Sequence, residues 1–216
     1  MNTWLTSEER SLIIEKATNA IVVWDFDGVI TDSEPLQAST YQMMLKSFGV
    51  SETLDFTEYV GSTEATIWNA LIKRYNLKQS LAELKEERMV LLSELAHKQL
   101  KPTWIVGELV APLQEVSQRQ VILSNGEISL IKSLLKAWGL DSILEIIQKP
   151  NEGRKREILA DLVYKNKSLV FEDNQGTLEY ARGLGAFSVG IVHPMFQESL
   201  VADILLPIEG YGVSLP

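Results

Sequence analysis

Residues 21–32 read IVVWDFDGVITD, four apolar residues followed at once by a segment rich in acidic side chains. The apolar run 21–24 predicts a short strand that is buried on both faces, as the strands of a parallel sheet are. In such a sheet, ligands bind beyond the carboxyl ends of the strands, so Asp25 and Asp27 lie where chemistry is expected. Because residues i and i+2 of an extended chain point the same way, both carboxylates can face one small volume.

Further apolar runs recur along the chain and, in its second half, alternate with segments of helical period. Strands are predicted at 21–24, 120–123, 143–147, 168–171, 187–192 and, more weakly, 204–206. Apolar positions at helical spacing lie between them, at 128–138 and 158–163. This alternation predicts an α/β fold with a Rossmann-like parallel sheet core and helices on both faces.

The chain between the first two predicted strands has no convincing strand of its own. It carries three apolar stripes at helical spacing, at 36–44, 65–75 and 81–95. We therefore expect an all-helical insertion over 32–111, with prolines near its end, and a core formed by 1–31 and 112–216. We expect the charged run 83–88 to be a solvated face of one of these helices.

The composition excludes several classes of function. Lys and Arg total 20 against 29 Asp and Glu, a net charge of −9 that repels nucleic acid and anionic membranes. The chain has no Cys, which removes thiol nucleophiles and disulfides. With only His97 and His193, histidine-based triads and zinc sites are disfavoured; we expect a surface histidine and a turn residue, respectively.

The N-terminal residues and the lengths of the apolar runs indicate where the protein is located. The N-terminal residues are acidic, unlike the basic start of a signal peptide, and no apolar run approaches the ~18 residues that a membrane span needs. We therefore expect a soluble cytoplasmic protein that has no nucleic acid or membrane as a partner. The sequence leaves its oligomeric state open.

Polar residues also follow two other predicted strands. Ser124, Asn125 and Gly126 precede a predicted helix, where a hydroxyl beside free N–H groups could hold a phosphate. An ordinary helix cap by Ser124 or Asn125 is the alternative. Glu172 and Asp173 add an acidic pair at the same predicted edge, and these too could be helix caps.

Closely spaced carboxylates need a shared proton or cation, because like charges repel. Mg²⁺ prefers carboxylate and water oxygens and is the natural cation for Asp25 and Asp27. The alternatives are a solvated loop or a calcium loop. The calcium loop fails because Gly28 is the fourth residue counted from Asp25, whereas that motif has glycine at position six.

Three stretches, WDFDGVITDSEP, LSNG and FEDNQGTLEYARGLGA, occur in the order of the motifs of a known superfamily. They resemble the haloacid dehalogenase-like hydrolases, in particular the phosphatase and β-phosphoglucomutase-like branch with a helical cap, over about residues 21–206. The resemblance implies that Asp25 is a nucleophile forming an aspartyl-phosphate, and that Asp27 is the general acid and then the base. It also implies Mg²⁺ held by Asp25, the backbone carbonyl of Asp27 and Asp173, with Glu172 bound directly or through water.

The resemblance further implies a phosphate cradle of Ser124 and the backbone of Asn125 and Gly126, together with a lysine that binds phosphate. Lys149 and Lys155 both compete for this role. We favour Lys155, because it opens a predicted helix, and keep Lys149 as the alternative.

These motifs predict a Mg²⁺-dependent phosphatase that acts on a small phosphorylated metabolite, such as a sugar phosphate. The alternatives are a β-phosphoglucomutase-like mutase and a catalytically idle metabolite-binding protein. Mutases of the family have His where this chain has Gln37 and Arg where it has Glu64, and a carboxylate would repel a second phosphate. Gln37 and Glu64 are therefore candidate substrate-facing residues of the insertion, although Glu64 could equally be a first-turn acid that favours the helix dipole.

Overall fold

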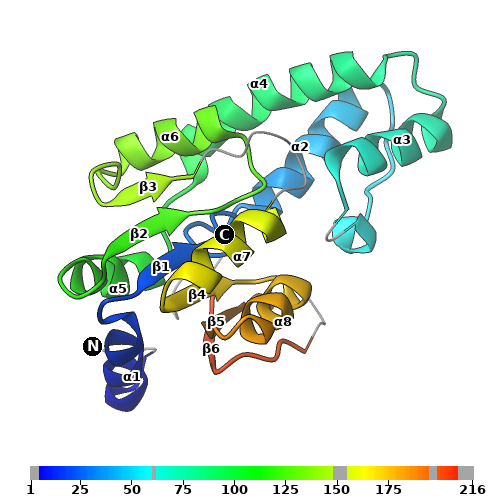
Figure 1. The fold of residues 1–216 in the computed structure, drawn as a ribbon. Coiled ribbons are helices and arrows are strands. Elements are labelled where there is room, and N and C mark those ends of the chain that lie inside the picture. The colour runs from blue at the N-terminus through cyan, green and yellow to red at the C-terminus, as the bar shows by residue number, and fades with distance from the viewer. Residues whose placement is uncertain (1–4, 60–61, 148–154, 195–198, 209–216) are drawn as a thin grey trace. The chain divides into compact units, whose positions relative to one another are not determined.

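The structure is a computed structural model that describes residues 5–59, 62–147, 155–194 and 199–208 (Figure 1). The chain divides into two compact units. Unit 1 consists of Met1–Asp32 and Lys101–Pro216, and unit 2 of Ser33–Leu100.

Unit 1 is built on a six-stranded sheet. Its strands are β1 (Ile21–Trp24), β2 (Arg119–Ile122), β3 (Leu144–Ile146), β4 (Ser168–Glu172), β5 (Phe187–Val192) and β6 (Ile204–Pro207). All neighbouring strands are parallel, in the order β3-β2-β1-β4-β5-β6. The predicted α/β fold with a Rossmann-like parallel sheet is therefore confirmed. Since β1 lies between β2 and β4, the three strands with polar carboxyl ends are neighbours.

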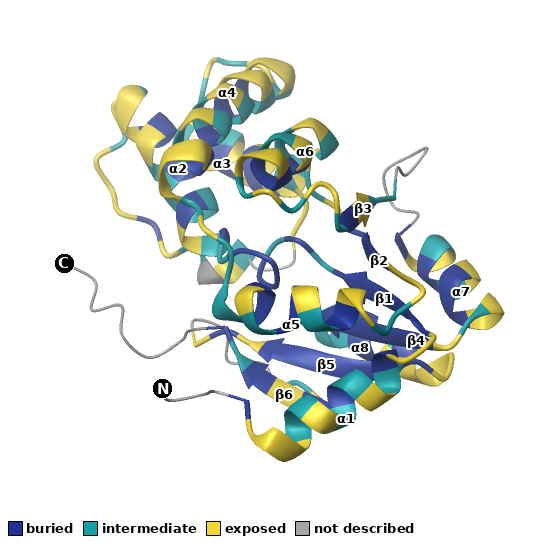
Figure 2. Cartoon of the chain, turned by 90° about the vertical axis from the view of Figure 1, so that its left-hand side faces the viewer, coloured by how far each residue is buried: buried dark blue, intermediate teal, exposed yellow. Residues whose placement is uncertain are grey.

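The described helices of unit 1 pack around this sheet. They are α1 (Ser7–Ala17), α5 (Trp104–Gln114), α6 (Ile128–Ala137), α7 (Lys155–Lys165) and α8 (Gln175–Gly183). Helix α1 contacts β4, α5 contacts β2, and the two helices contact each other. Helix α8 contacts β4, β5 and α7, and α6 contacts β3. In Figure 2 the central strands are buried, whereas the helices around them carry exposed residues. The apolar runs of the strands thus form the core.

The second boundary of the insertion differs from the prediction. Unit 2 ends at Leu100, rather than at 111, and α5 belongs to unit 1. Its apolar residues Ile105, Leu109 and Leu113 are fully buried, and the helix packs on α1 and β2. Pro112, one of the prolines near the expected end of the insertion, lies inside α5. The sequence suggested otherwise because the chain between the first two predicted strands has no convincing strand of its own, and nothing in the segment up to 111 reveals which unit buries it.

A buried polar network joins β1, β2 and α5 beneath the sheet edge. Trp24 is fully buried and stacks on Phe171 at a centroid distance of 3.9 Å. Its indole Nε1 donates to Gln120 Oε1 at 3.0 Å, and Gln120 Nε2 donates to the Val110 carbonyl at 2.7 Å. Because unpaired buried polar groups are costly, these contacts favour one alignment of the strands that carry the site.

The described residues of unit 2 form helices and connecting turns. The helices are α2 (Glu34–Ser47), a short 3₁₀ helix (Phe56–Tyr59), α3 (Glu64–Tyr75) and α4 (Leu81–Gln99). They enclose an apolar core of their own around Trp68, Leu71 and Leu84. Thr63 and Ser80 cap α3 and α4 through their side chains. Across the described ranges, no helix is both long enough and apolar enough to cross a membrane.

Candidate active site

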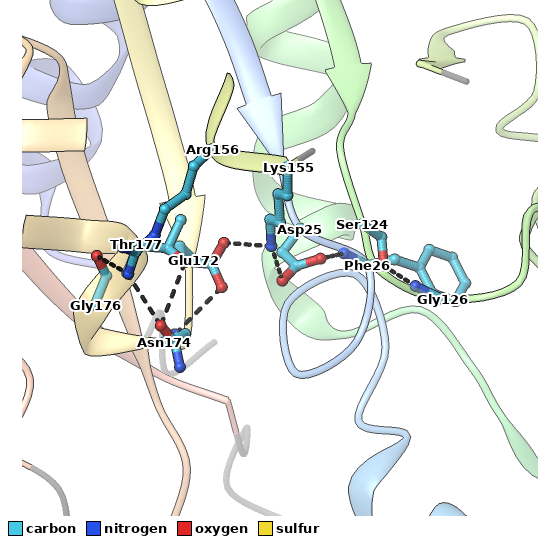
Figure 3. A network of polar contacts seen from close by, with 10 residues as sticks. All are labelled: Asp25, Phe26, Ser124, Gly126, Lys155, Arg156, Glu172, Asn174, Gly176 and Thr177. Atoms are coloured by element: carbon cyan, nitrogen blue, oxygen red, sulfur yellow. Dashed lines mark hydrogen bonds and ion pairs between the residues drawn. The ribbon is translucent and has the colours of Figure 1, made fainter. Parts of the chain in front are cut away.

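The candidate site lies at the carboxyl edge of the unit 1 sheet, where Asp25 directly follows β1. The Lys155 ammonium donates to Asp25 Oδ2 at 2.5 Å and to Glu172 Oε2 at 2.7 Å (Figure 3). The side chains of Asp25, Lys155 and Glu172 are only 11%, 10% and 2% exposed. Lys155 opens α7 and Glu172 ends β4, so residues far apart in sequence meet around one ammonium group.

The pKa shifts reflect this crowding. Burial alone would lower the pKa of Lys155, but the carboxylates of Asp25 and Glu172 raise it above its ordinary value. Burial and the charge of Asp25 raise the pKa of Glu172 well above its usual range, and the nearby Lys155 opposes this only in part. The site thus holds more negative charge than one lysine neutralises, which favours binding of a cation.

The oxygen donors present fit a Mg²⁺ ion. Asp25, Glu172 and Asp173 each place a carboxylate oxygen within 4.8 Å of the others. Gly28 permits the approach of Asp173: its φ is +69°, and a Cβ built there would lie 2.0 Å from Asp173 Oδ2. Mg²⁺ prefers such hard oxygen ligands, and this group consists of three carboxylates with no His or Cys in it.

The Asp27 carboxylate lies beside Gly126, which is in the segment that follows β2. A Cβ built at Gly126 would stand 2.9 Å from Asp27 Oδ2 and 3.3 Å from Ser124 Oγ. The absence of a side chain at Gly126 therefore leaves space between the Asp27 carboxylate and the Ser124 hydroxyl. A group bound there could contact both side chains.

The segment after β2 differs in one respect from the sequence-based alternatives. Helix α6 begins at Ile128 and is capped by Glu127, which accepts a hydrogen bond from the Ser129 N–H, so the prediction of a cap by Ser124 or Asn125 is wrong. Ser124 Oγ instead accepts from the Gly126 N–H at 2.9 Å. Its own hydroxyl proton can then be donated elsewhere, as binding of a phosphoryl oxygen would require.

Of the two candidate lysines, Lys155 lies among the described residues. Its ammonium contacts the carboxylate that follows β1, as described above. Lys149 lies outside the described residues.

In unit 2, the two candidate substrate-facing residues share one buried partner, Arg88. Its guanidinium donates to Glu64 Oε1 at 3.0 Å, to Gln37 Oε1 at 3.3 Å and to Thr40 Oγ1 at 3.0 Å. It also lies 3.9 Å from the centroid of the Tyr41 ring, which adds a cation–π contact. Arg88 is only 3% exposed, so the prediction that 83–88 is a solvated face is wrong at this position. Because α4 packs on α2 and α3, position 88 is buried.

The Glu64–Arg88 ion pair gives a testable expectation for stability. Glu64→Arg should lower the free energy of unfolding by roughly 3 kcal/mol, because it replaces the partner of a buried cation with a second cation. Glu64→Gln keeps a carbonyl acceptor for Arg88 and should lower the free energy of unfolding by less than Glu64→Arg does. Urea denaturation of both variants would measure this order. Equal stabilities for Glu64→Arg and wild type would show that the pair contributes nothing.

The structure also reveals a polar pair in unit 1 that sequence reasoning missed. His193 is 3% exposed, and its Nε2 lies 3.1 Å from Asp32 Oδ1, at a sequence separation of 161 residues. The sequence predicts a turn at His193 and indicates no role for Asp32. No local pattern could have paired two residues that only the sheet brings together.

With this geometry established, the family of the chain can be stated. The family model of the haloacid dehalogenase-like hydrolases matches residues 22–191. The chain belongs to this family. It is therefore an enzyme of the hydrolase class, and the resemblance carried by its three motifs is confirmed.

Three known proteins resemble this haloacid dehalogenase-like hydrolase over most of its length. A phosphorylated carbohydrates phosphatase from Thermotoga maritima is 25% identical over 189 residues, covering 81% of this chain and 86% of that protein. A T. maritima protein provisionally named β-phosphoglucomutase superimposes with a TM-score of 0.71 at 21% identity, covering 87% and 94%. CbbY from Rhodobacter sphaeroides, in complex with xylulose-1,5-bisphosphate, does so with a TM-score of 0.71 at 16% identity, covering 87% and 93%. The two solved structures show a shared fold.

Proposed function

We propose that this hydrolase is a cytoplasmic, Mg²⁺-dependent phosphatase that releases phosphate from a small phosphorylated metabolite, such as a sugar phosphate. The observation that carries the proposal is the buried contact of the Lys155 ammonium with Asp25 and Glu172, at the strand end where a nucleophile is expected. The name of the T. maritima phosphatase supports a phosphorylated carbohydrate as the substrate class.

In the first step, a carboxylate oxygen of Asp25 attacks the phosphorus of the substrate. An O–P bond forms to Asp25 while the bond from phosphorus to the leaving alcohol oxygen breaks. Asp27, in its protonated form, gives its proton to that oxygen. Lys155 and the Ser124 hydroxyl offset the charge on the transferring phosphoryl oxygens.

In the second step, water hydrolyses the aspartyl-phosphate. Asp27, now a carboxylate, takes a proton from the water as the water oxygen attacks phosphorus. The bond between phosphorus and the Asp25 oxygen breaks, which releases inorganic phosphate and restores the Asp25 carboxylate. Asp27 is again protonated, so the cycle is closed.

The residues that would hold Mg²⁺ are Asp25, Asp173 and the backbone carbonyl of Asp27, with Glu172 bound directly or through water. When bound, the ion would neutralise charge on the transferring phosphoryl group. Asp25, Asp173 and Glu172 are the group whose carboxylate oxygens converge.

A mutase is the second candidate, because one solved structure of similar fold is provisionally named β-phosphoglucomutase. A mutase must hold a second phosphate, and this chain has Glu64 where mutases of the family have an Arg for that purpose. We therefore favour hydrolysis. Phosphorus NMR of a sugar 1-phosphate incubated with the enzyme separates the two reactions: a phosphatase produces inorganic phosphate, and a mutase produces the sugar 6-phosphate.

The proposed activity is tested by phosphate release from p-nitrophenyl phosphate and a panel of sugar phosphates, each with Mg²⁺ and with excess EDTA. We expect Mg²⁺-dependent release and faster turnover of at least one sugar phosphate. No release above the background from any compound would favour the metabolite-binding alternative.

Asp173→Asn is expected to raise the Mg²⁺ concentration for half-maximal activity by at least roughly tenfold, because a charged oxygen ligand becomes a neutral amide. A Mg²⁺ titration of initial rates measures this. The matched control is Asp161→Asn, whose carboxylate is 75% exposed and pairs only with Lys165 among the contacts of the described residues. An unchanged titration in Asp173→Asn would remove Asp173 from the metal site.

A further inference from the structure

His193 is a buried titratable residue that the proposed chemistry does not use. It directly follows β5, and its side chain is 1% exposed while that of Asp32 is 33% exposed. The Asp32 carboxylate is an acceptor at 3.1 Å, so His193 Nε2 carries the proton and donates it. A hydrogen bond to a carboxylate is stronger than one between neutral groups, and burial of the imidazole shields it from water.

Asp32 occupies a particular place in the chain. It is the last residue of unit 1 before the chain enters unit 2 at Ser33. The return connection re-enters unit 1 at Lys101, whose carbonyl accepts a hydrogen bond from Thr31 Oγ1 at 2.9 Å. Thr103 N–H donates to the Ile30 carbonyl at 2.9 Å. The two chain segments that lead to and from unit 2 are therefore joined to each other by hydrogen bonds within unit 1.

The residues before Asp32 are fixed by packing. Val29, Ile30 and Thr31 are fully buried, and the Gly28 N–H donates to the Thr31 carbonyl at 2.9 Å. Asp32 is only partly buried, so its position depends more on the contact of its side chain with His193.

We propose that His193 is a positioning residue: by holding Asp32, it restricts the freedom of unit 2 about its first connection to unit 1. The inference rests on the proposed function and adds that the inserted unit serves as a lid for substrates larger than phosphate itself, as inserted units and loops of enzymes commonly do. We call the hydrogen bond between His193 and Asp32 the tether. If it excludes unproductive orientations of unit 2 before the substrate binds, less conformational entropy is lost when unit 2 closes over the substrate. His193 does not touch the reacting groups in this proposal.

The test compares His193→Ala with the wild-type full-length enzyme. We expect kcat/KM for the best sugar phosphate of the panel to fall about tenfold, as for the loss of one hydrogen bond to a charged group. Inhibition by inorganic phosphate and the Mg²⁺ titration should not change, because they report on unit 1 alone. A general loss of folding would alter all three, whereas loss of the tether alters only the first.

Conservative variants make the test independent of folding defects. His193→Gln keeps an N–H donor and should recover most of kcat/KM, and Asp32→Asn keeps an acceptor and should act likewise. Asp32→Ala should match His193→Ala, and the double alanine variant should lose no more than either. His97→Ala is the matched control, since His97 lies on α4 and should leave all constants unchanged.

Hydrogen exchange provides a readout that does not depend on activity. Amides of 32–36 should exchange faster in His193→Ala than in wild type, while those of β1 and β4 stay protected. If wild type hydrolyses no phosphomonoester, the proposed function fails, but this exchange comparison still tests the tether. Wild-type exchange at 32–36, or wild-type kcat/KM in His193→Ala, would overturn the positioning role.

Discussion

Asp25→Asn is expected to lower kcat by at least roughly three decades, down to the background rate, with the fold intact. The amide keeps the shape of the carboxylate but lacks its nucleophilic oxygen, so no aspartyl-phosphate can form. Stability should change little, because the substitution removes the Lys155 contact but also one carboxylate from the crowded group of Asp25, Glu172 and Asp173.

Steady-state phosphate release and circular dichroism together test this variant. Acid quenching of the wild-type enzyme during turnover, followed by peptide mass analysis, should locate one added phosphoryl group on Asp25 and none in Asp25→Asn. The control, Asp161→Asn, should keep wild-type rates because its side chain is exposed. A folded Asp25→Asn enzyme with wild-type turnover would contradict the nucleophile assignment.

Lys155→Ala has the largest expected combined effect on rate and stability. Loss of a cation beside the phosphoryl group typically costs ~2–4 kcal/mol of transition-state stabilisation, or about two to three decades in kcat. Removing one partner of a buried ion pair also lowers the free energy of unfolding by roughly 3–5 kcal/mol, because Asp25 and Glu172 then lie together without their shared cation.

The stability loss in Lys155→Ala should grow with pH. The pKa of Glu172 is already raised by burial and by Asp25, and loss of Lys155 removes the charge that opposes this. A carboxyl whose pKa is higher in the folded state binds more protons there than when unfolded, so stability falls as pH rises above the ordinary pKa of 4.5. Urea denaturation at pH 5 and pH 8 should therefore show the larger loss at pH 8.

Two lysine variants serve as controls. Lys165→Ala removes a side chain that is 66% exposed and should change neither rate nor stability. Lys149→Ala tests the alternative lysine and should cost less activity than Lys155→Ala. If Lys149→Ala is the more damaging change, the assignment of Lys155 is wrong.

Much of the core of unit 1 could be predicted from local patterns. A strand buried on both faces requires consecutive apolar residues, so 21–24 and 168–171 stand out without knowledge of their partners. The polar segments that follow such strands lie at one edge of a parallel sheet, so Asp25, Ser124 and Glu172 were candidates for one site.

Other features depended on contacts that no local pattern contains. The charged context of Arg88 suggested exposure, yet α2 and α3 cover it and supply its acceptors. The segment of α5 was assigned to the insertion because no strand is predicted between 24 and 120, whereas in the structure it packs on α1 and β2. The alternative of an α6 cap by Ser124 or Asn125 was wrong because several polar side chains precede that helix, and the backbone path selects Glu127.

The sequence by itself determined the parallel sheet and the residues at the carboxyl ends of its strands, because both follow from the period and order of side chains along short segments. Only the tertiary structure decided which charges neutralise one another: Lys155 between Asp25 and Glu172, Arg88 with Glu64, and His193 with Asp32. Partners of this kind are selected by distance in space. Hydrogen bonds are lost within a few ångströms and Coulombic attraction weakens steadily with distance, and sequence separation does not encode these distances in space.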